Sequence, residues 1–290
     1  MLTPTAAIQT RIRNLIGATP AAFVRIDGGY TPALRWTFQA GGVRLFVKVA
    51  TTPMTAGMLR SEVQAYINLR AGFMPDFVGW DDDPAHPLLI IEDLSDAVWP
   101  PPWTPDRVDQ VRAQIAMMHR TPATLAPFAG LHGAHDGNWA AVAADPAPFL
   151  GLRLVTPAWL DLALPLLLTA EERCTTGGAA LTHWDLRSDN ICITSRGVKF
   201  VDWAEACLSN PELDLGFWLP SLAAEGGPSP EQILPDRPQV AAWVAGFFAA
   251  RAGLPSIPDA PRVRQVQRQQ LAPALAWAVH ALDLPQPDAV

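Results

Sequence analysis

One stretch of the chain, residues 181–216, constrains its fold most: LTHWDLRSDNICITSRGVKFVDWAEACLSNPELDLG. Two apolar, β-rich runs lie inside it, at residues 190–194 and 198–201. The Ser-Arg-Gly sequence at 195–197 that separates them is typical of a hairpin turn. The stretch therefore predicts a β-hairpin whose two ends lie side by side.

Acidic and amide side chains flank this predicted hairpin. Asp185 and Asn190 precede its first strand, and Asp202 follows its second strand. Because a hairpin brings its ends together, we expect two carboxylates and an amide oxygen to gather in one place. Hard oxygen ligands of this kind suit Mg2+ better than zinc or copper.

The spacing of these residues, as well as their chemistry, is similar to that of a known fold. His183-x-Asp185, Asn190 five residues later, a hairpin and then Asp202 resemble the catalytic loop and metal-binding Asp of the protein-kinase-like fold. The chain is most similar to the aminoglycoside phosphotransferase family of small-molecule kinases. The resemblance implies that Asp185 takes the proton of the attacking hydroxyl. It also implies that Asn190 and Asp202 hold the Mg2+ ions that bridge the phosphates.

Two departures from the family pattern bear on the substrate side of this loop. Trp184 replaces the usual small residue, and Arg-Ser-Asp at 187–189 replaces the more common His-Pro-Gly. We assign Arg187 to the catalytic residues, where it would offset charge developing on the phosphoryl group; a surface salt bridge is the alternative. The resemblance also implies that Asp214 is a buried residue that braces the loop through hydrogen bonds.

The first part of the chain is rich in strand patterns, with strands expected at 23–26, 34–39 and 43–49. The turn between the first two contains Gly29, Tyr30 and Thr31, which we assign to nucleotide binding. A glycine-bearing loop between strands can bring backbone N–H groups close to phosphates, although such a sequence often forms only a turn.

The third expected strand carries Lys48, one of only two lysines among 21 basic residues. A lysine inside an apolar strand of an arginine-rich chain suggests a demand for a compact ammonium group. The alternative is a strand lysine that extends to solvent. In the resemblance, Lys48 contacts the α- and β-phosphates. The expected helix over 55–71 places Glu62 beside its apolar face, so we assign Glu62 as the partner of Lys48.

A later expected strand, residues 88–91, ends in Glu92-Asp93-Leu94. The resemblance makes this segment the hinge between two lobes. It implies that backbone groups near Glu92 and Leu94 form hydrogen bonds to the adenine edge.

Composition bounds the class of protein. The chain has 290 residues, 49% of them hydrophobic and 17% charged, which is typical of a globular protein. A net charge of −7 argues against nucleic-acid binding and is compatible with a cationic ligand. No run reaches the roughly 20 apolar residues that span a bilayer, and residues 1–17 lack a signal-peptide core. With three cysteines and no CxxC pair, we expect a cytoplasmic location.

The sequence as a whole predicts an α+β, protein-kinase-like bilobal fold. The small β-rich nucleotide-binding lobe would cover residues 1–95, and the larger, mainly helical catalytic and substrate-binding lobe residues 96–290. Helices are expected over 155–174, as one helix or a pair, and over 218–224, 239–252 and 263–281. Few residues separate Asp202 from Asp214, which leaves no room for a long activation segment and favours a small-molecule acceptor over a protein.

These observations predict an O-phosphotransferase that moves the γ-phosphoryl group of ATP or GTP, with Mg2+, to a hydroxyl of a small molecule. An aminoglycoside or another antibiotic is one acceptor, in a resistance-type kinase. The alternatives are a metabolite kinase of the choline, homoserine or sugar type, a nucleotide-binding pseudokinase, and a metal-dependent phosphohydrolase. We expect a monomer or homodimer with no nucleic-acid or membrane partner. Glu225, Asp236 and Asp259 are candidate contacts to a cationic acceptor, or surface charges.

Overall fold

The computed structural model describes residues 3–132 and 137–287. Its contacts divide the chain into two compact units. The first comprises Met1–Pro100, Ala123–Leu125 and Asp189–Ala206, and the second comprises Pro101–Pro122, Ala126–Ser188 and Cys207–Val290. The hairpin region thus groups by its contacts with the N-terminal part of the chain. The boundary between residues 1–95 and 96–290 stays a prediction.

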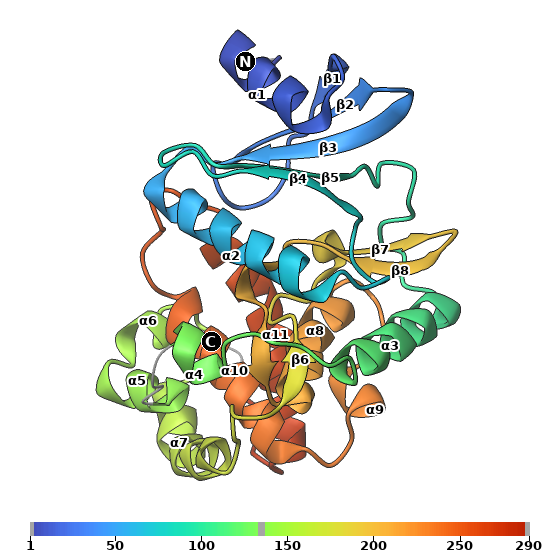
Figure 1. Ribbon diagram of the computed structural model, residues 1–290. Coiled ribbons are helices and arrows are strands. Elements are labelled where there is room, and N and C mark those ends of the chain that lie inside the picture. Colours follow the sequence, from blue (N-terminus) through green and yellow to red (C-terminus); the bar gives the residue numbers. More distant parts are fainter. Residues whose placement is uncertain (1–2, 133–136, 288–290) are drawn as a thin grey trace. The chain divides into compact units, whose positions relative to one another are not determined.

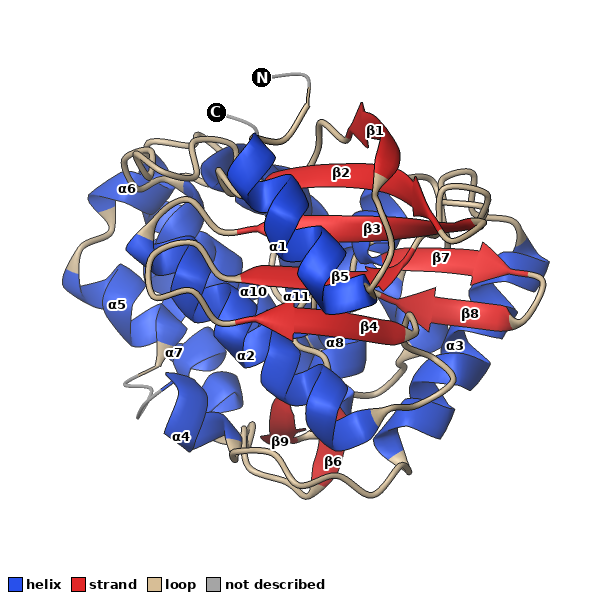
Figure 2. Ribbon diagram, turned by 45° about the horizontal axis from the view of Figure 1, so that its top comes forward, coloured by secondary structure: helices blue, strands red, loops and turns tan. Residues whose placement is uncertain are grey.

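An antiparallel five-stranded sheet forms the centre of the first unit (Figure 2). Its order is β1-β2-β3-β5-β4, with β1 (Ala21–Arg25), β2 (Leu34–Ala40), β3 (Val43–Val49), β4 (Phe77–Asp81) and β5 (Leu88–Glu92). Helices α1 (Ala6–Ile16) and α2 (Pro53–Leu69) lie on opposite sides of this sheet (Figure 1). The expected strands at 23–26, 34–39 and 43–49 are confirmed to within two residues at each end.

Strand β3 shows how the sheet separates a core from a polar face. Leu45, Val47 and Val49 are buried in one cluster with Ile12 of α1. Since successive side chains of a strand point to opposite faces, Lys48 lies on the other face, the one that α2 covers. The apolar alternation of the strand therefore decides where its single lysine points.

A capping motif in the local sequence sets the start of helix α2. The Thr52 hydroxyl accepts a hydrogen bond from the backbone N–H of Thr55, and the Thr55 hydroxyl accepts one from the N–H of Thr52 at 3.0 Å. Pro53 occupies the first turn, where a missing N–H costs nothing. This reciprocal capping fixes the start of the helix that carries Glu62.

The predicted hairpin is confirmed as β7 (Ile191–Thr194) paired with β8 (Gly197–Phe200). The 3-10 turn η1 (Ser188–Asn190) precedes it and η2 (Trp203–Glu205) follows it. The backbone N–H of Val201 donates to the carbonyl of Asn190 at 3.0 Å, which closes the base of the hairpin. Trp203 is fully buried against Phe73 and Phe200, so an aromatic cluster packs beneath that base.

The second unit is mainly helical. It contains α3 (Pro105–His119), α4 (Phe128–His132), α5 (Asn138–Ala144), α6 (Ala147–Leu150), α7 (Pro157–Glu172), α8 (Pro211–Ala224), α9 (Pro230–Ile233), α10 (Pro238–Ala252) and α11 (Val263–Ala281), and two paired three-residue strands, β6 (Ala180–Thr182) and β9 (Cys207–Ser209). Helix α7 is a single helix, and the expected helices over 239–252 and 263–281 are confirmed. None of the helices within the described ranges has the length and apolarity needed to cross a bilayer.

The expected start of a helix at residue 218 is wrong. Helix α8 begins at Pro211, where the Asn210 side chain caps it by accepting from the N–H of Glu212 at 3.0 Å. Between Asp202 and this helix the chain forms only η2 and the short strand β9. Over this described stretch, the chain therefore contains no long activation segment, as expected.

Candidate active site

A cluster of opposite charges lies on the α2 side of the sheet. The Lys48 ammonium contacts Glu62 Oε2 at 2.7 Å and Asp202 Oδ1 at 3.0 Å. The Lys48 side chain is 12% exposed, that of Glu62 3% and that of Asp202 31%. The structure therefore brings together three residues that the sequence analysis assigned to one site, although they lie 14 and 154 positions apart in the chain.

Electrostatics in this cluster keep Lys48 charged. Burial is the largest influence on the pKa of Lys48 and lowers it, but the carboxylates of Asp202 and Glu62 outweigh burial and leave that pKa raised. Burial raises the pKa of Glu62, and the negative charge of Asp202 adds to this against the opposing effect of Lys48. The ammonium therefore sits between two carboxylates, one enclosed and one open to solvent.

Asp202 and Asn190 occupy the two ends of the hairpin, as predicted. Asp202 adopts a left-handed backbone conformation, with φ of 64°, which is uncommon outside glycine, asparagine and aspartate. Asn190 is 5% exposed. A part-exposed carboxylate and an amide side chain at one hairpin base offer the hard oxygen atoms that Mg2+ prefers, so Asn190 and Asp202 could hold this ion.

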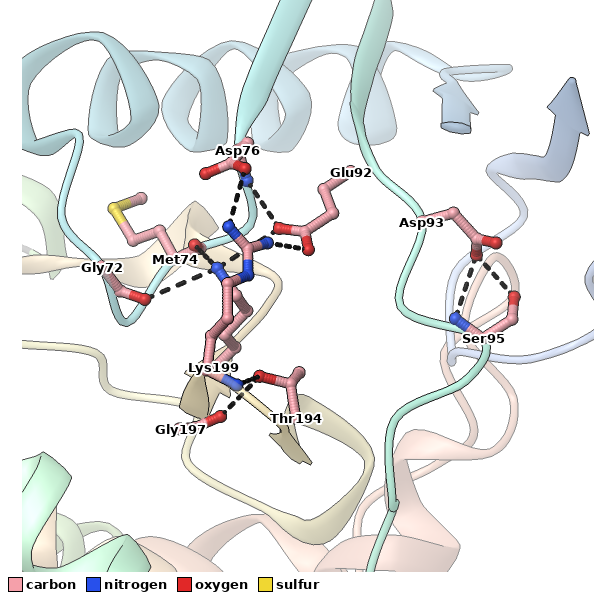
Figure 3. A network of polar contacts seen from close by, with 10 residues as sticks. Gly72, Met74, Asp76, Glu92, Asp93, Ser95, Thr194, Gly197 and Lys199 are labelled. Carbon is pink, nitrogen blue, oxygen red and sulfur yellow. Dashed lines mark hydrogen bonds and ion pairs between the residues drawn. The ribbon is translucent and has the colours of Figure 1, made fainter. Parts of the chain in front are cut away.

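A second lysine anchors this hairpin (Figure 3). Lys199 of β8 is 2% exposed, and its ammonium donates to the carbonyl of Met74 at 2.7 Å and pairs with Glu92 Oε2 at 3.2 Å. Glu92 also pairs with Arg196 in the hairpin turn and accepts from the N–H of Asp76 at 3.1 Å. The end of strand β5 and the hairpin that carries Asn190 and Asp202 are thus tied together by one polar network.

The predicted hinge residues, Glu92 and Leu94, already make contacts within the first unit. The carboxylate of Glu92 is engaged with the hairpin, and its backbone N–H donates to the carbonyl of Asp76 at 2.9 Å. The carbonyl of Leu94 accepts from the indole of Trp99 at 3.2 Å and from the N–H of Ala97 at 3.0 Å. The adenine contacts assigned to Glu92 and Leu94 stay a prediction.

The loop around Asp185 belongs to the second unit. Arg187 contacts both carboxylate oxygens of Asp185, with Nε 3.0 Å from Oδ1 and Nη2 3.1 Å from Oδ2. The Asp185 side chain is 36% exposed, while that of Arg187 is 14% exposed. The hydrogen bond from Nη2 to Oδ2, together with the ion pair between Nε and Oδ1, restrains the direction of this carboxylate.

Asp214 braces this loop, as expected. It is fully buried, and its Oδ1 accepts from the backbone N–H groups of His183 at 3.1 Å and Trp184 at 2.8 Å. Its Oδ2 lies 2.8 Å from Nε2 of His119 in α3. One carboxylate therefore joins the loop, α3 and α8.

Trp184, one departure from the family pattern, has a structural explanation. Its φ of 61° lies in the left-handed region, where a bulky residue is strained. The indole N–H donates to Ser209 Oγ at 2.6 Å, and the ring packs against Phe128, Phe217 and Trp243. The buried indole anchors a backbone conformation that glycine would adopt without strain.

Two polar residues with structural roles in these units were missed or differently interpreted. Glu225, a candidate contact to the acceptor, has both oxygens engaged: Oε1 accepts from Ser188 at 2.5 Å and Oε2 from Trp103 at 2.7 Å. Arg35 was not singled out, yet it is buried beside the glycine-bearing loop. Only its register opposite Lys48 in the folded sheet marks it, and no local pattern could show that register.

The fold and the placement of these residues define a protein-kinase-like phosphotransferase, as predicted. The chain belongs to the phosphotransferase enzyme family (APH), whose family model matches residues 23–264. No curated protein matches the chain significantly. The expected enzyme class, a phosphotransferase with an alcohol group as acceptor, is confirmed at the level of the family.

Solved structures show the same fold at low sequence identity. A thermostable mutant of aminoglycoside phosphotransferase APH(4)-Ia, in complex with ADP and hygromycin B, matches with a TM-score of 0.59 and 16% identity over 96% of this chain and 98% of that chain. Spectinomycin phosphotransferase APH(9)-Ia, with ADP and spectinomycin, matches with a TM-score of 0.59 and 10% identity over 98% and 99%. Choline kinase LicA from Streptococcus pneumoniae matches with a TM-score of 0.57 and 12% identity over 96% of this chain and 98% of that chain.

Proposed function

We propose that this protein transfers the γ-phosphoryl group of ATP or GTP to a hydroxyl of a small molecule. The observation that carries the proposal is the Lys48 ammonium held between Glu62 and Asp202 at 2.7 and 3.0 Å. A buried ammonium oriented by one enclosed carboxylate is suited to binding phosphate oxygens. A phosphohydrolase that used the same carboxylates would have no need of this pair.

The residues of the hairpin base fit a divalent cation. Asn190 and Asp202 would hold Mg2+ through oxygen atoms, and such a site is completed by substrate phosphates and water. When bound, the metal supplies positive charge that stabilises the transferring phosphoryl group. Gly29, Tyr30 and Thr31 would contact the phosphates from the loop between β1 and β2.

Residues of the second unit would act on the acceptor. Asp185 would accept the proton of the attacking hydroxyl, and Arg187 would hold its carboxylate in one direction and add positive charge near the reaction. Asp214 would keep the loop backbone in place. In this scheme the protein contributes chiefly position and charge, which is what phosphoryl transfer requires.

The proposed acceptor is a hydroxylated small molecule, and two classes of acceptor are considered: antibiotics and metabolites. The structural relatives include enzymes with aminoglycoside or spectinomycin in their complexes and a choline kinase. A net charge of −7 favours an acceptor that carries an amine in either class. We place a hydroxylated antibiotic first, in a resistance-type enzyme, and a metabolite of the choline, homoserine or sugar type second.

Acceptor-dependent formation of ADP or GDP tests the proposal. Wild-type protein and Asp185→Ala are compared with Mg2+ over aminoglycosides, other hydroxylated antibiotics, choline and sugars. We expect turnover with one acceptor class and its loss in the variant. Nucleotide hydrolysis without any acceptor, equal in both proteins, would contradict the proposal and favour a hydrolase or a contaminant. Nucleotide binding without turnover on any acceptor would favour a pseudokinase.

A further inference from the structure

One buried cation near the glycine-bearing loop has no place in the scheme so far. Arg35 of β2 is 9% exposed and pairs in register with Lys48 of β3. Directly opposed residues of an antiparallel pair lie on the same face of the sheet, so the guanidinium shares the polar face with the Lys48 ammonium. A buried arginine is costly unless its hydrogen-bonding groups are satisfied.

Arg35 satisfies its donors almost entirely on the loop between β1 and β2. Its Nη1 donates to the carbonyl oxygens of Gly28 at 3.0 Å, Ala33 at 2.9 Å and Thr31 at 3.5 Å. Its Nη2 donates to the Thr31 hydroxyl at 3.2 Å. One planar fork therefore holds four oxygen atoms across residues 28–33, which a lysine ammonium could not do in the same geometry.

The loop closes around this guanidinium at Gly29. The φ of Gly29 is +75°, a conformation that favours glycine. A Cβ built there would lie 2.7 Å from Nη2 of Arg35, so the guanidinium occupies the space that any side chain would need. Glycine at this position is explained by both the backbone conformation and the close approach of Arg35.

Peptide geometry gives this arrangement a consequence for ligands. The carbonyl of Gly28 points toward Arg35, and in a trans peptide the N–H of the next residue points the opposite way. The N–H of Gly29 is therefore directed away from the guanidinium. Successive backbone N–H groups turned outward form anion-binding concavities, and Gly29 supplies one such group in this loop.

The charge of Arg35 persists despite burial. Burial is the largest influence on the pKa of Arg35 and lowers it, while Asp202 and Glu62 raise it. An arginine pKa begins so high that the group stays protonated in proteins. The loop is consequently held by a permanent cation. The two carboxylates of the Lys48 cluster, Asp202 and Glu62, stabilise the charge of this cation.

We propose that Arg35 is a positioning residue that sets the shape of the loop over residues 27–33, so that its backbone N–H groups receive the phosphates of the nucleotide. The inference rests on the proposed function, because it concerns the donor site of the same reaction. In this proposal, the guanidinium of Arg35, and not the glycines alone, gives the loop the shape that fits a triphosphate.

Calorimetric binding of triphosphates and nucleosides tests this role. MgATP and MgGTP are compared with adenosine and guanosine on wild type, Arg35→Met and Arg35→Lys. We expect both variants to bind the triphosphate about tenfold more weakly or worse, corresponding to ~1.4 kcal/mol, with nucleoside affinity changed less than about twofold. In turnover, the KM for nucleotide should rise while kcat at saturation stays within about threefold.

Two further variants sharpen the outcome. Gly29→Ala keeps Arg35 but displaces it, so it should weaken triphosphate binding in the same way; it decides the question if Arg35→Met does not fold. Arg25→Met removes an arginine that pairs with the exposed Asp27 of this loop at 3.5 Å and lies over the Trp36 ring, and it should bind as the wild type does because Arg35 keeps its contacts.

Each contrary result has one meaning. Wild-type affinity in Arg35→Lys would show that charge alone suffices and would overturn the positioning role. Equal loss of triphosphate and nucleoside binding in folded variants would show a general structural role and overturn it too. Nucleotide binding and turnover in wild type, unchanged in the Arg35 and Gly29 variants, would remove this inference but leave the proposed function. Absence of any nucleotide binding in wild type would remove both.

Discussion

Arg187 holds both carboxylate oxygens of Asp185, at 3.0 and 3.1 Å, within a single loop of the second unit. The pair lies only two positions apart in the sequence, so the loop conformation itself aligns the fork with the carboxylate. A part-exposed ion pair contributes little free energy, but its hydrogen bond from Nη2 to Oδ2 restricts the direction of the carboxylate. We therefore regard Arg187 as the residue that aims the proposed base.

Replacing Arg187 by lysine should lower kcat roughly ten- to hundredfold, because a point charge cannot hold both oxygens and the carboxylate would sample other directions. The KM for nucleotide should change little. Steady-state kinetics with a saturating acceptor measures both quantities, and Arg173→Lys, an exposed arginine of the same unit, is the matched control. Unchanged kcat in Arg187→Lys would reduce the contact to a surface salt bridge.

The Lys48–Glu62 contact should behave as one functional unit. Lys48→Met and Glu62→Gln should each lower kcat/KM for nucleotide, roughly a hundredfold for the first and tenfold for the second, because Glu62 acts by orienting the ammonium. The double variant should then be no worse than Lys48→Met alone. A double-mutant cycle in kcat/KM measures this coupling, and strictly additive losses would mean that the two residues act independently.

Lys199 should control the opening of the hairpin that carries Asn190 and Asp202. Burial raises the pKa of the Cys192 thiol in β7 to about 12, so at pH 8 only roughly one thiol in 10⁴ is ionised, and alkylation of the folded protein should be very slow. Lys199→Met should raise the rate of Cys192 alkylation tenfold or more. Site-resolved mass spectrometry after timed iodoacetamide exposure measures this rate.

The direction of that effect makes the experiment diagnostic. The charge of Lys199 itself lowers the pKa of Cys192, so its removal alone would slow alkylation; a faster rate can only report opening. Cys174, outside the hairpin and with a burial-raised pKa also of about 12, is an internal reference. Arg196→Met, which removes the exposed partner of the same Glu92, should change the rate less than twofold. Equal acceleration at both cysteines would indicate general destabilisation instead.

Much of the first unit could be predicted because its signals are local. The alternation around Lys48 fixes its face of the sheet, and the turn at 195–197 fixes the hairpin that brings Asp202 back toward Lys48. Glu62 followed from its place beside an apolar helix face. These patterns depend on neighbouring residues, so they can be read without knowing the rest of the fold.

What could not be predicted depends on contacts between distant segments. Arg35 is one of many arginines, and only its register opposite Lys48 reveals its role. Strands β6 and β9 have three residues each, too few for a periodic pattern. The network of Lys199 joins residues more than 100 positions apart. The side chains that position the assigned residues were therefore the hardest to find in the sequence.

Asp214 offers the sharpest test of such a positioning group, because its carboxylate is fully buried and contacts three partners. Asp214→Ala would leave the N–H groups of His183 and Trp184 without their acceptor and His119 without its partner. We expect a loss of about 3 to 5 kcal/mol in the free energy of unfolding, as for other broken buried polar contacts.

Asp214→Asn separates charge from hydrogen bonding. The amide oxygen can still accept from the His183 and Trp184 N–H groups, and the amide nitrogen can donate to His119 Nε2 in its other tautomer, so the loss should be only about 1 kcal/mol. Urea unfolding at pH 7 measures both variants. If asparagine is as damaging as alanine, the negative charge itself stabilises the loop. If both are tolerated, the brace is unnecessary, and the strained φ of Trp184 must be maintained by the packing of its indole.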